Sequence, residues 1–478
     1  MSNNNLRSNV MLQTGYQIFS LIIPFVSAPY VARVLGSENV GIYSFNYSII
    51  NYFMIVQMLG LETYGNRAIA KVKGNKCEVN RLFSEIIIAH ILVSIVVLIA
   101  YVFYLGTLNG IALTIGIIQT IYLIGQALNI SWLYAGLGEF KITVLRSIII
   151  KILVLVAVFN FVNSNNDLLI YIFILAADMF FSQITLWLPV RKYVRFTKIQ
   201  FTNVLSHIKP MSILFVSIIA SSIYRMMDKT MLGFMGSLSN LGCYEYADKI
   251  IRMPLSVVIG LGLVMLSKTA SMYGIGENEK VIKLTSKTLM FVTAFSSLMV
   301  FGFLSYGKMF SILYLGINYE YTGVLLMILS PTILLCAWNN VLRTQYFIPQ
   351  ELDNAYVMAT SVGAIINVLL NVLLIPKYDC FGAAIGTVVS YFSVTIIMLY
   401  MARKDFKLFS LVLKNLLLFA VGVIPFFVSY IIKKILPFNW GSFFVQIIIF
   451  CTIFVFLCTP VFVKNRMLFY WKKGKKSN

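Results

Sequence analysis

Charged side chains are scarce in this chain of 478 residues. Asp, Glu, Lys and Arg make up 12% of the sequence, whereas hydrophobic residues make up 59%. Soluble domains are about half apolar and about a quarter charged. The composition therefore excludes a soluble globular protein and also a disordered chain. A bilayer is the solvent that fits such a sequence over its whole length.

Acidic residues and cysteines are also few. The chain has 17 Asp and Glu residues against 38 Lys and Arg residues, which gives a net charge of +21, and it has six cysteines. These cysteines form no CxxC motif and no close pair, so neither a disulfide framework nor a metal site is implied. Basic residues in a multispanning protein mainly record which loops are cytoplasmic, so the charge indicates orientation rather than nucleic-acid binding.

The sequence also lacks the motifs of common enzymes. It contains no P-loop for ATP, no HExxH and no spacing typical of a catalytic triad. The longest hydrophilic stretches, 191–210 and 267–287, are too short to be domains. We therefore expect a transporter without a cofactor or metal, driven by an ion gradient or by trapping of its product, and no enzyme.

Long apolar windows predict an all-α integral membrane protein with about fourteen transmembrane helices. Strands are excluded as spans because the windows are continuously apolar and do not alternate. The expected spans are residues 9–32, 40–62, 82–104, 110–134, 142–162, 168–190, 211–235, 241–266, 288–305, 322–342, 355–375, 381–401, 409–431 and 441–463.

Basic residues gather in alternate loops between these spans. With the N-terminus inside, the basic clusters at 67–81, 191–209, 280–287 and 464–476 all become cytoplasmic, and the intervening loops hold few Lys and Arg residues. Cytoplasmic loops carry the excess of basic residues in membrane proteins. The pattern predicts an even number of spans with both termini in the cytoplasm.

Two sequence matches at one offset suggest an internal duplication. Residues 33–43 resemble 233–244, and residues 81–84 resemble 283–286, each at an offset near 200 residues. An even number of spans per copy gives parallel repeats, as in some secondary transporters. We expect two six-helix lobes around a central cavity, followed by two further helices and a basic tail. The predicted divisions are residues 1–205, 206–405 and 406–478.

Two expected spans carry charged stripes. In the seventh and eighth spans the charges recur at helical spacing, so each set lies on one face. Charged side chains at mid-bilayer are costly and usually face a cavity or one another. We expect these faces to point to the interior between the lobes rather than to lipid. The charged residues are Arg225, Asp228 and Lys229 in the seventh span, and Glu245, Asp248, Lys249 and Arg252 in the eighth.

These charges permit two interpretations. One is a wet cavity that Arg33 and Lys151 make more positive still, and a positive lumen in a low-dielectric surround selects anions. The other is a structural ion-pair network, with Glu245–Lys249 and Asp248–Arg252 pairing within the helix.

Asp178 and His90 are considered separately among the ionisable residues of the expected spans. Asp178 of the sixth span is either a partner for Lys151, which we favour, or a proton or sodium site. His90 of the third span is expected to be a packing residue rather than a ligand.

Segments in three places resemble one known family. They resemble motifs of bacterial polysaccharide repeat-unit flippases. The three segments are residues 129–141 with Arg146 and Lys151 downstream, residues 228–233 followed by 242–244, and residues 363–376 followed by 382–387. These O-antigen and capsule flippases belong to the multidrug/oligosaccharidyl-lipid/polysaccharide (MOP) exporter superfamily. The likeness extends over roughly residues 5–405.

The resemblance implies a function in a bacterial cytoplasmic membrane. The substrate would be undecaprenyl pyrophosphate carrying one oligosaccharide repeat unit, moved from the inner to the outer leaflet for surface polysaccharide biosynthesis. Further partners would be the lipid bilayer, H⁺ or Na⁺ as coupling ion, and a polysaccharide polymerase with glycosyltransferases. No nucleic acid is expected.

The resemblance also suggests roles for the charged residues. Arg225 and Arg252 are candidates to hold the pyrophosphate, because the planar guanidinium fork matches phosphate oxygens. The weaker substrate-binding candidates are Lys229, Lys249, Arg33 and Lys151, and the charge partners or coupling candidates are Asp228, Asp248, Glu245 and Asp178. The alternatives are an ion-coupled drug or metabolite exporter of the same superfamily, which typically moves cations, and a non-transporting membrane scaffold.

The predicted topology is testable by thiol labelling. Single cysteines at 191–210 and at 267–287, in a background without the native cysteines, should resist an impermeant reagent applied outside intact cells, because both loops are expected in the cytoplasm. A cysteine at Lys308, which is expected outside, should react in the same cells and serves as the control. Ready labelling of both loops would contradict the topology.

Overall fold

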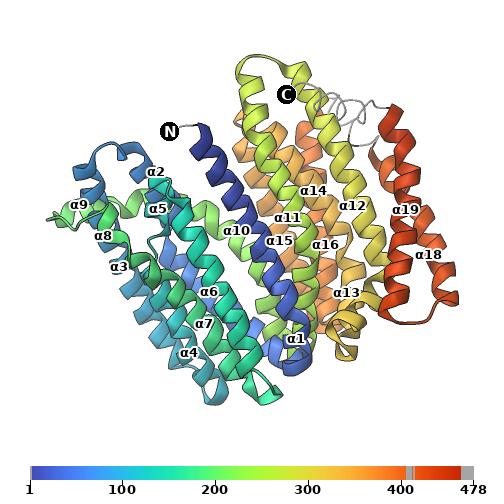
Figure 1. Ribbon diagram of the computed structural model, residues 1–478, viewed down its shortest axis with the longest axis horizontal. Coiled ribbons are helices and arrows are strands. Elements are labelled where there is room, and N and C mark those ends of the chain that lie inside the picture. Colours follow the sequence, from blue (N-terminus) through green and yellow to red (C-terminus); the bar gives the residue numbers. More distant parts are fainter. Residues whose placement is uncertain (1–2, 405–411, 413–414, 465–478) are drawn as a thin grey trace. The chain divides into compact units, whose positions relative to one another are not determined.

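The computed structural model describes the backbone of residues 3–404, 412 and 415–464. The side chains of residues 3–18, 21, 140, 216–225, 404 and 461–464 are outside this description. The described backbone consists of helices and their connections and contains no strand (Figure 1). The expected all-α membrane fold is confirmed.

The chain divides into two compact units, Met1–Gly233 and Phe234–Asn478. These units are defined by packing, whereas the predicted lobes are defined by the offset of the sequence repeat. The predicted lobes therefore stay a prediction. The helices of the first unit are α1 (Asn3–Met58), α2 (Leu61–Val72), α3 (Lys76–Leu105), α4 (Gly110–Ala127), α5 (Ser131–Leu137), α6 (Phe140–Phe161), α7 (Leu168–Ile184), α8 (Val190–Tyr193), α9 (Phe201–Ser206) and most of α10 (Ile208–Met235).

The second unit begins just before the end of α10. Short 3₁₀ and π turns join several of its helices, among them the π turn Arg343–Phe347. Its helices are α11 (Leu238–Gly274), α12 (Asn278–Leu315), α13 (Glu320–Leu329), α14 (Pro331–Leu342), α15 (Asp353–Tyr378), α16 (Cys380–Met401), α18 (Val423–Ile435) and α19 (Trp440–Lys464).

Many helices are long and apolar enough to cross a membrane. Among the described residues there are 10 such helices, or 11 if the pair Ile317–Leu329 and Pro331–Gln350, bent by 43°, is one span. These 11 match all expected spans except the first, second and seventh. The first two lie in α1 and the seventh in α10. The number of fourteen transmembrane helices stays a prediction, because only these 10 or 11 described helices meet the criterion of length and hydropathy.

Glycine 36 breaks α1 into two helices. Its backbone angles, φ 74° and ψ 170°, are not helical, and only glycine adopts them without steric cost. The break falls between the first and second expected spans. The chain also breaks at Gly236 and Ser237, between α10 and α11, so the paired sequence motifs of the repeat both mark helix junctions.

Short helices cover one end of the first unit, where α2 packs on α5 (Figure 1). Trp132 of α5 lies directly over Gly65, where an added Cβ would come within 2.5 Å of its ring. One turn along α5, Gly136 gives the same close approach to Ile69. Asn129 accepts a hydrogen bond from the Ser131 backbone at 2.9 Å and starts α5. The motif at 129–141 therefore builds the contact that holds α2.

Small residues also join α15 and α16 in the second unit. A Cβ on Gly382 would come within 2.4 Å of the Leu374 carbonyl oxygen, and one on Gly386 would meet Asn371. The Ser390 hydroxyl donates a hydrogen bond to the Gly363 carbonyl at 2.6 Å. Lipid tails are as apolar as leucine, so membrane helices associate through such close packing and hydrogen bonds. This contact explains the motif at 363–387.

The close contact at Gly382 gives a stability prediction. Gly382→Ala should destabilise the protein by about 1–3 kcal/mol, because the added methyl group meets backbone that cannot rotate away. Gly302→Ala in α12 is the matched control, since nothing lies within 4 Å of its added Cβ. Thermal unfolding in one detergent measures both variants. Equal melting temperatures for the two would contradict the assignment.

Candidate functional site

The charged stripe of α11 forms two ion pairs. Lys249 Nζ lies 2.9 Å from Glu245 Oε1, and Arg252 Nε lies 2.7 Å from Asp248 Oδ1. In both pairs the acid precedes the base by four residues, which is the favourable order on a helix. The acids are mostly buried, whereas the side chains of Lys249 and Arg252 are 40% and 44% exposed. The bases are thus only partly exposed while buried carboxylates hold them.

Neighbouring helices fix the position of this stripe. The Tyr244 hydroxyl lies 3.3 Å from Thr387 Oγ1 of α16, and the Thr322 hydroxyl of α13 donates to the Cys243 carbonyl at 3.0 Å. Arg252 interacts electrostatically with Tyr391 of α16, whose hydroxyl is hydrogen-bonded to Cys336 of α14. Because α11 is anchored to three helices, the two ion pairs occupy a defined place in the unit.

An aspartate that sequence reasoning missed caps the start of α11. Asp379 stands between α15 and α16 in a left-handed conformation, φ 52°, which is uncommon for a residue with a side chain. Its Oδ2 accepts hydrogen bonds from the Ser237 backbone at 3.0 Å and from Asn240 Nδ2 at 2.9 Å. Its position in the sequence, an acidic residue in the turn between two predicted helices, could have indicated this role.

Two charges of α10 are buried in the first unit. Asp228 is 7% exposed and Lys229 is 9% exposed. Next to them, Thr230 Oγ1 forms hydrogen bonds with two residues of α1. It lies 3.1 Å from the Tyr52 hydroxyl and donates to Ser48 Oγ at 2.9 Å. Asp228 also acts electrostatically on Tyr52. The Arg225 side chain lies outside the described residues, although its backbone belongs to α10.

The first unit also brings Asp178 and Lys151 together. They lie on α7 and α6, which pack against each other, and Lys151 acts electrostatically on the Asp178 carboxylate. The Ser182 hydroxyl donates to Asp178 Oδ1 at 3.3 Å. Arg33, near the end of the first part of α1, is exposed.

His90 is fully buried, and its Nε2 lies 2.9 Å from the Gln126 carbonyl of α4. It therefore joins α3 to α4, as a packing residue does. In the part of the chain that is described, no group of three His, Cys, Asp or Glu side chains can hold a metal ion.

A family model described as polysaccharide biosynthesis protein matches residues 6–266, more than half of the chain. The protein belongs to this family. One relative is described as a putative O-antigen transporter of Shigella dysenteriae. It is 25% identical over 403 residues, covering 83% of this chain and 99% of the relative.

Solved structures show the fold of this family member. A lipid II flippase, MurJ, in an inward closed conformation matches with a TM-score of 0.74 and 14% identity, over 95% of this chain and 99% of that one. An outward-facing multidrug resistance MATE transporter of the MOP superfamily matches with a TM-score of 0.56 and 16% identity, over 85% and 95%. The expected superfamily fold is confirmed.

The Asp248–Arg252 pair predicts a measurable coupling energy. In a double-mutant cycle with Asp248→Asn and Arg252→Gln, the coupling should be at least about 1 kcal/mol, because the carboxylate is shielded from water. The exposed pair Glu277–Lys280 provides the control, with an expected coupling of about 0.3 kcal/mol. Reversible unfolding in bicelles measures both cycles, and equal couplings would refute the claim.

Proposed function

We propose that this protein is a flippase that moves undecaprenyl-pyrophosphate-linked oligosaccharide from the cytoplasmic to the outer leaflet of a bacterial cytoplasmic membrane. It is a multi-pass membrane protein of the polysaccharide biosynthesis family, with the fold of MOP transporters. The name of the Shigella relative, a putative O-antigen transporter, supports a role in moving polysaccharide precursors. The observation that carries the proposal is the half-exposed Arg252 held by Asp248 in a membrane-spanning helix.

Arg252 has the chemistry that a pyrophosphate needs. Arginine keeps its proton in proteins, so its charge persists inside a membrane where lysine can become neutral. Arg252 Nε donates to Asp248 Oδ1, and the guanidinium also carries two terminal nitrogens that can donate to phosphate oxygens. In this proposal the carboxylate neutralises the arginine while the site is empty and shares it with phosphate when the substrate arrives.

An apolar pocket in the second unit suits the lipid part of the substrate. Its volume is about 460 Å³, and it is lined only by apolar side chains of α12, α14, α16 and the segment before α18. The lining residues Leu335 and Phe392 are sequence neighbours of Cys336 and Tyr391, which lie close to Arg252. A polyprenyl chain in this pocket would begin near the cation that holds its pyrophosphate.

The other expected roles remain part of this proposal. H⁺ or Na⁺ would serve as coupling ion, with Asp178, Asp228, Glu245 and Asp248 as candidate sites. A polysaccharide polymerase and glycosyltransferases would be functional partners.

Drug export is the competing function, because MATE transporters share the fold. Cation export favours acids without neighbouring bases in the cavity. Here Glu245, Asp248 and Asp178 each have a basic partner, which favours an anionic substrate. Binding of a lipid pyrophosphate sugar compared with a cationic dye separates the two functions. A membrane scaffold gains nothing from such buried charges.

The arginines give the functional prediction. Arg252→Ala and Arg225→Ala should abolish surface polysaccharide while the protein still reaches the membrane, because a fixed positive charge is lost. Arg252→Lys should restore flipping only in part, because the bidentate fork is absent. The measurement is leaflet-resolved flipping of the lipid-linked sugar in vesicles.

Lys308→Gln is the matched control for these variants. Lys308 also pairs with a carboxylate, but both side chains are about half exposed, with Lys308 near the end of α12 and Glu320 at the start of α13. This variant should flip at the wild-type rate. Wild-type flipping in both alanine variants would mean that the arginines serve only as structural ion pairs.

A further inference from the structure

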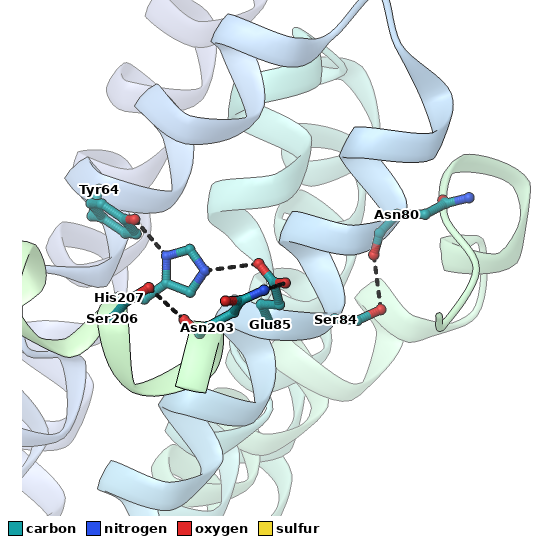
Figure 2. Close-up of polar contacts among 7 residues, drawn as sticks. All are labelled: Tyr64, Asn80, Ser84, Glu85, Asn203, Ser206 and His207. Carbon is teal, nitrogen blue, oxygen red and sulfur yellow. Dashed lines mark hydrogen bonds and ion pairs between the residues drawn. The ribbon is translucent and has the colours of Figure 1, made fainter. Parts of the chain in front are cut away.

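A buried cluster on the first unit lies outside the charged stripes (Figure 2). The imidazole of His207 is held from both sides: Nε2 lies 3.1 Å from Glu85 Oε2 of α3, and Nδ1 lies 2.6 Å from the Tyr64 hydroxyl of α2. Asn203 Nδ2 of α9 donates to the other oxygen of Glu85 at 3.3 Å. The sequence predicted none of these contacts.

The cluster fixes the segment that leads into α10. Just before α9, the Arg195 backbone donates to Asn80 Oδ1 at 2.9 Å, and the Thr197 backbone donates to Ser84 Oγ at 3.1 Å. Residues 194–200 are not helical, and side chains of α3 accept hydrogen bonds from two of their backbone N–H groups. His207 immediately precedes α10 and makes the last of these attachments. Residues 194–207, which connect α8 to α10 and are attached to α3, form the tether.

Burial makes the bond between His207 and Glu85 depend on charge. Glu85 is 3% exposed and His207 is 7% exposed, so neither side chain is well solvated. A buried carboxylate needs hydrogen-bond donors or an opposite charge. Neutral His207 supplies one N–H to the Glu85 carboxylate, whereas charged His207 adds the Coulomb attraction of an ion pair in a place with little water to screen it.

We propose that Tyr64, Glu85 and His207 form a cytoplasmic-side proton-binding site whose occupancy tightens the attachment of the tether to α3. Histidine is the side chain that ordinarily changes charge between about pH 5 and 8. With the proton bound, both ring nitrogens donate, to Glu85 and to the Tyr64 oxygen. Without it, Nδ1 accepts from the Tyr64 hydroxyl, and the attraction to Glu85 is that of a neutral ring.

The groups that face His207 come from three helices. From α2 the facing group is Tyr64, from α3 it is Glu85, and from α9 it is the neutral amide of Asn203. Burial and the Glu85 carboxylate raise the pKa of Tyr64, so its hydroxyl keeps its proton in this range. The nearby cations Arg81 and Lys209 are exposed to solvent.

The tether connects this site to the charges of α10. A tightened tether holds the start of the helix that carries Asp228 and Lys229. If the protein flips lipid-linked sugar, as proposed above, cytoplasmic pH should therefore change the flipping rate. The effect of the proton on the attachment of the tether to α3 does not depend on the flippase function.

Hydrogen exchange tests the site without any substrate. Protection factors of the Arg195 and Thr197 amides, corrected for intrinsic exchange, are measured at pH 6 and pH 8 on the full chain in lipid nanodiscs. Wild type should be protected several-fold more at pH 6, because the charged ring binds Glu85 more tightly. His207→Gln and Glu85→Gln keep a donor and the side-chain shape, and each should remove this pH dependence.

Two controls separate the proton site from simple loosening. Ser84→Ala removes the bond to Thr197 and should lower protection at both pH values while the pH dependence remains. His90→Gln changes the other histidine of the chain and should also leave the pH dependence intact. A pH dependence that survives unchanged in both His207→Gln and Glu85→Gln overturns the proposal.

Flipping in vesicles at the same two pH values supplies the functional comparison. Wild type should respond to the pH of the cytoplasmic side, and His207→Gln should not. If wild type flips no lipid-linked sugar but its exchange depends on His207, the proposed function fails and the proton site stands. If wild type flips and the exchange is independent of pH, the proton site fails alone.

Discussion

A charge inside a bilayer must have a partner, and this constraint governs the polar structure of the protein. Hydrocarbon offers no water to solvate a carboxylate, an ammonium or a guanidinium group, so an unpaired ion there costs several kcal/mol. The chain meets this requirement with pairs: Asp248 with Arg252, Glu245 with Lys249, and Lys151 beside Asp178. The helices that carry these residues must then pack so that each pair stays intact.

Features with a short period in sequence were predictable. Continuous apolar windows predicted the helices, because a span needs a fixed length of hydrocarbon-compatible sequence. Spacing by four residues also identified both pairs on α11, since the helix alone decides which side chains meet. Isolated residues in expected spans gave two further predictions: His90 as a packing residue, and Asp178 as a partner of Lys151 on the neighbouring span.

Contacts between distant segments were not predictable from one sequence. Glu85 and His207 are 122 residues apart, and Ser237 and Asp379 are 142 apart. No periodicity relates such positions, and an acid inside an expected span, as Glu85 is, does not show which distant residue it contacts. Thr230, beside Lys229, likewise contacts Ser48 and Tyr52, which are 182 and 178 residues away. These positions become visible only when tertiary packing brings the segments together.

The ion pairs differ in what a rearrangement of helices would do to them. Both pairs of α11 are internal to one helix, so the helix carries its own counterions wherever it moves. These two ion pairs therefore stay intact when the helix changes its neighbours. Asp178 and Lys151 lie on different helices, so separating α6 from α7 would weaken the electrostatic attraction between them. The first arrangement permits motion at little electrostatic cost, and the second resists it.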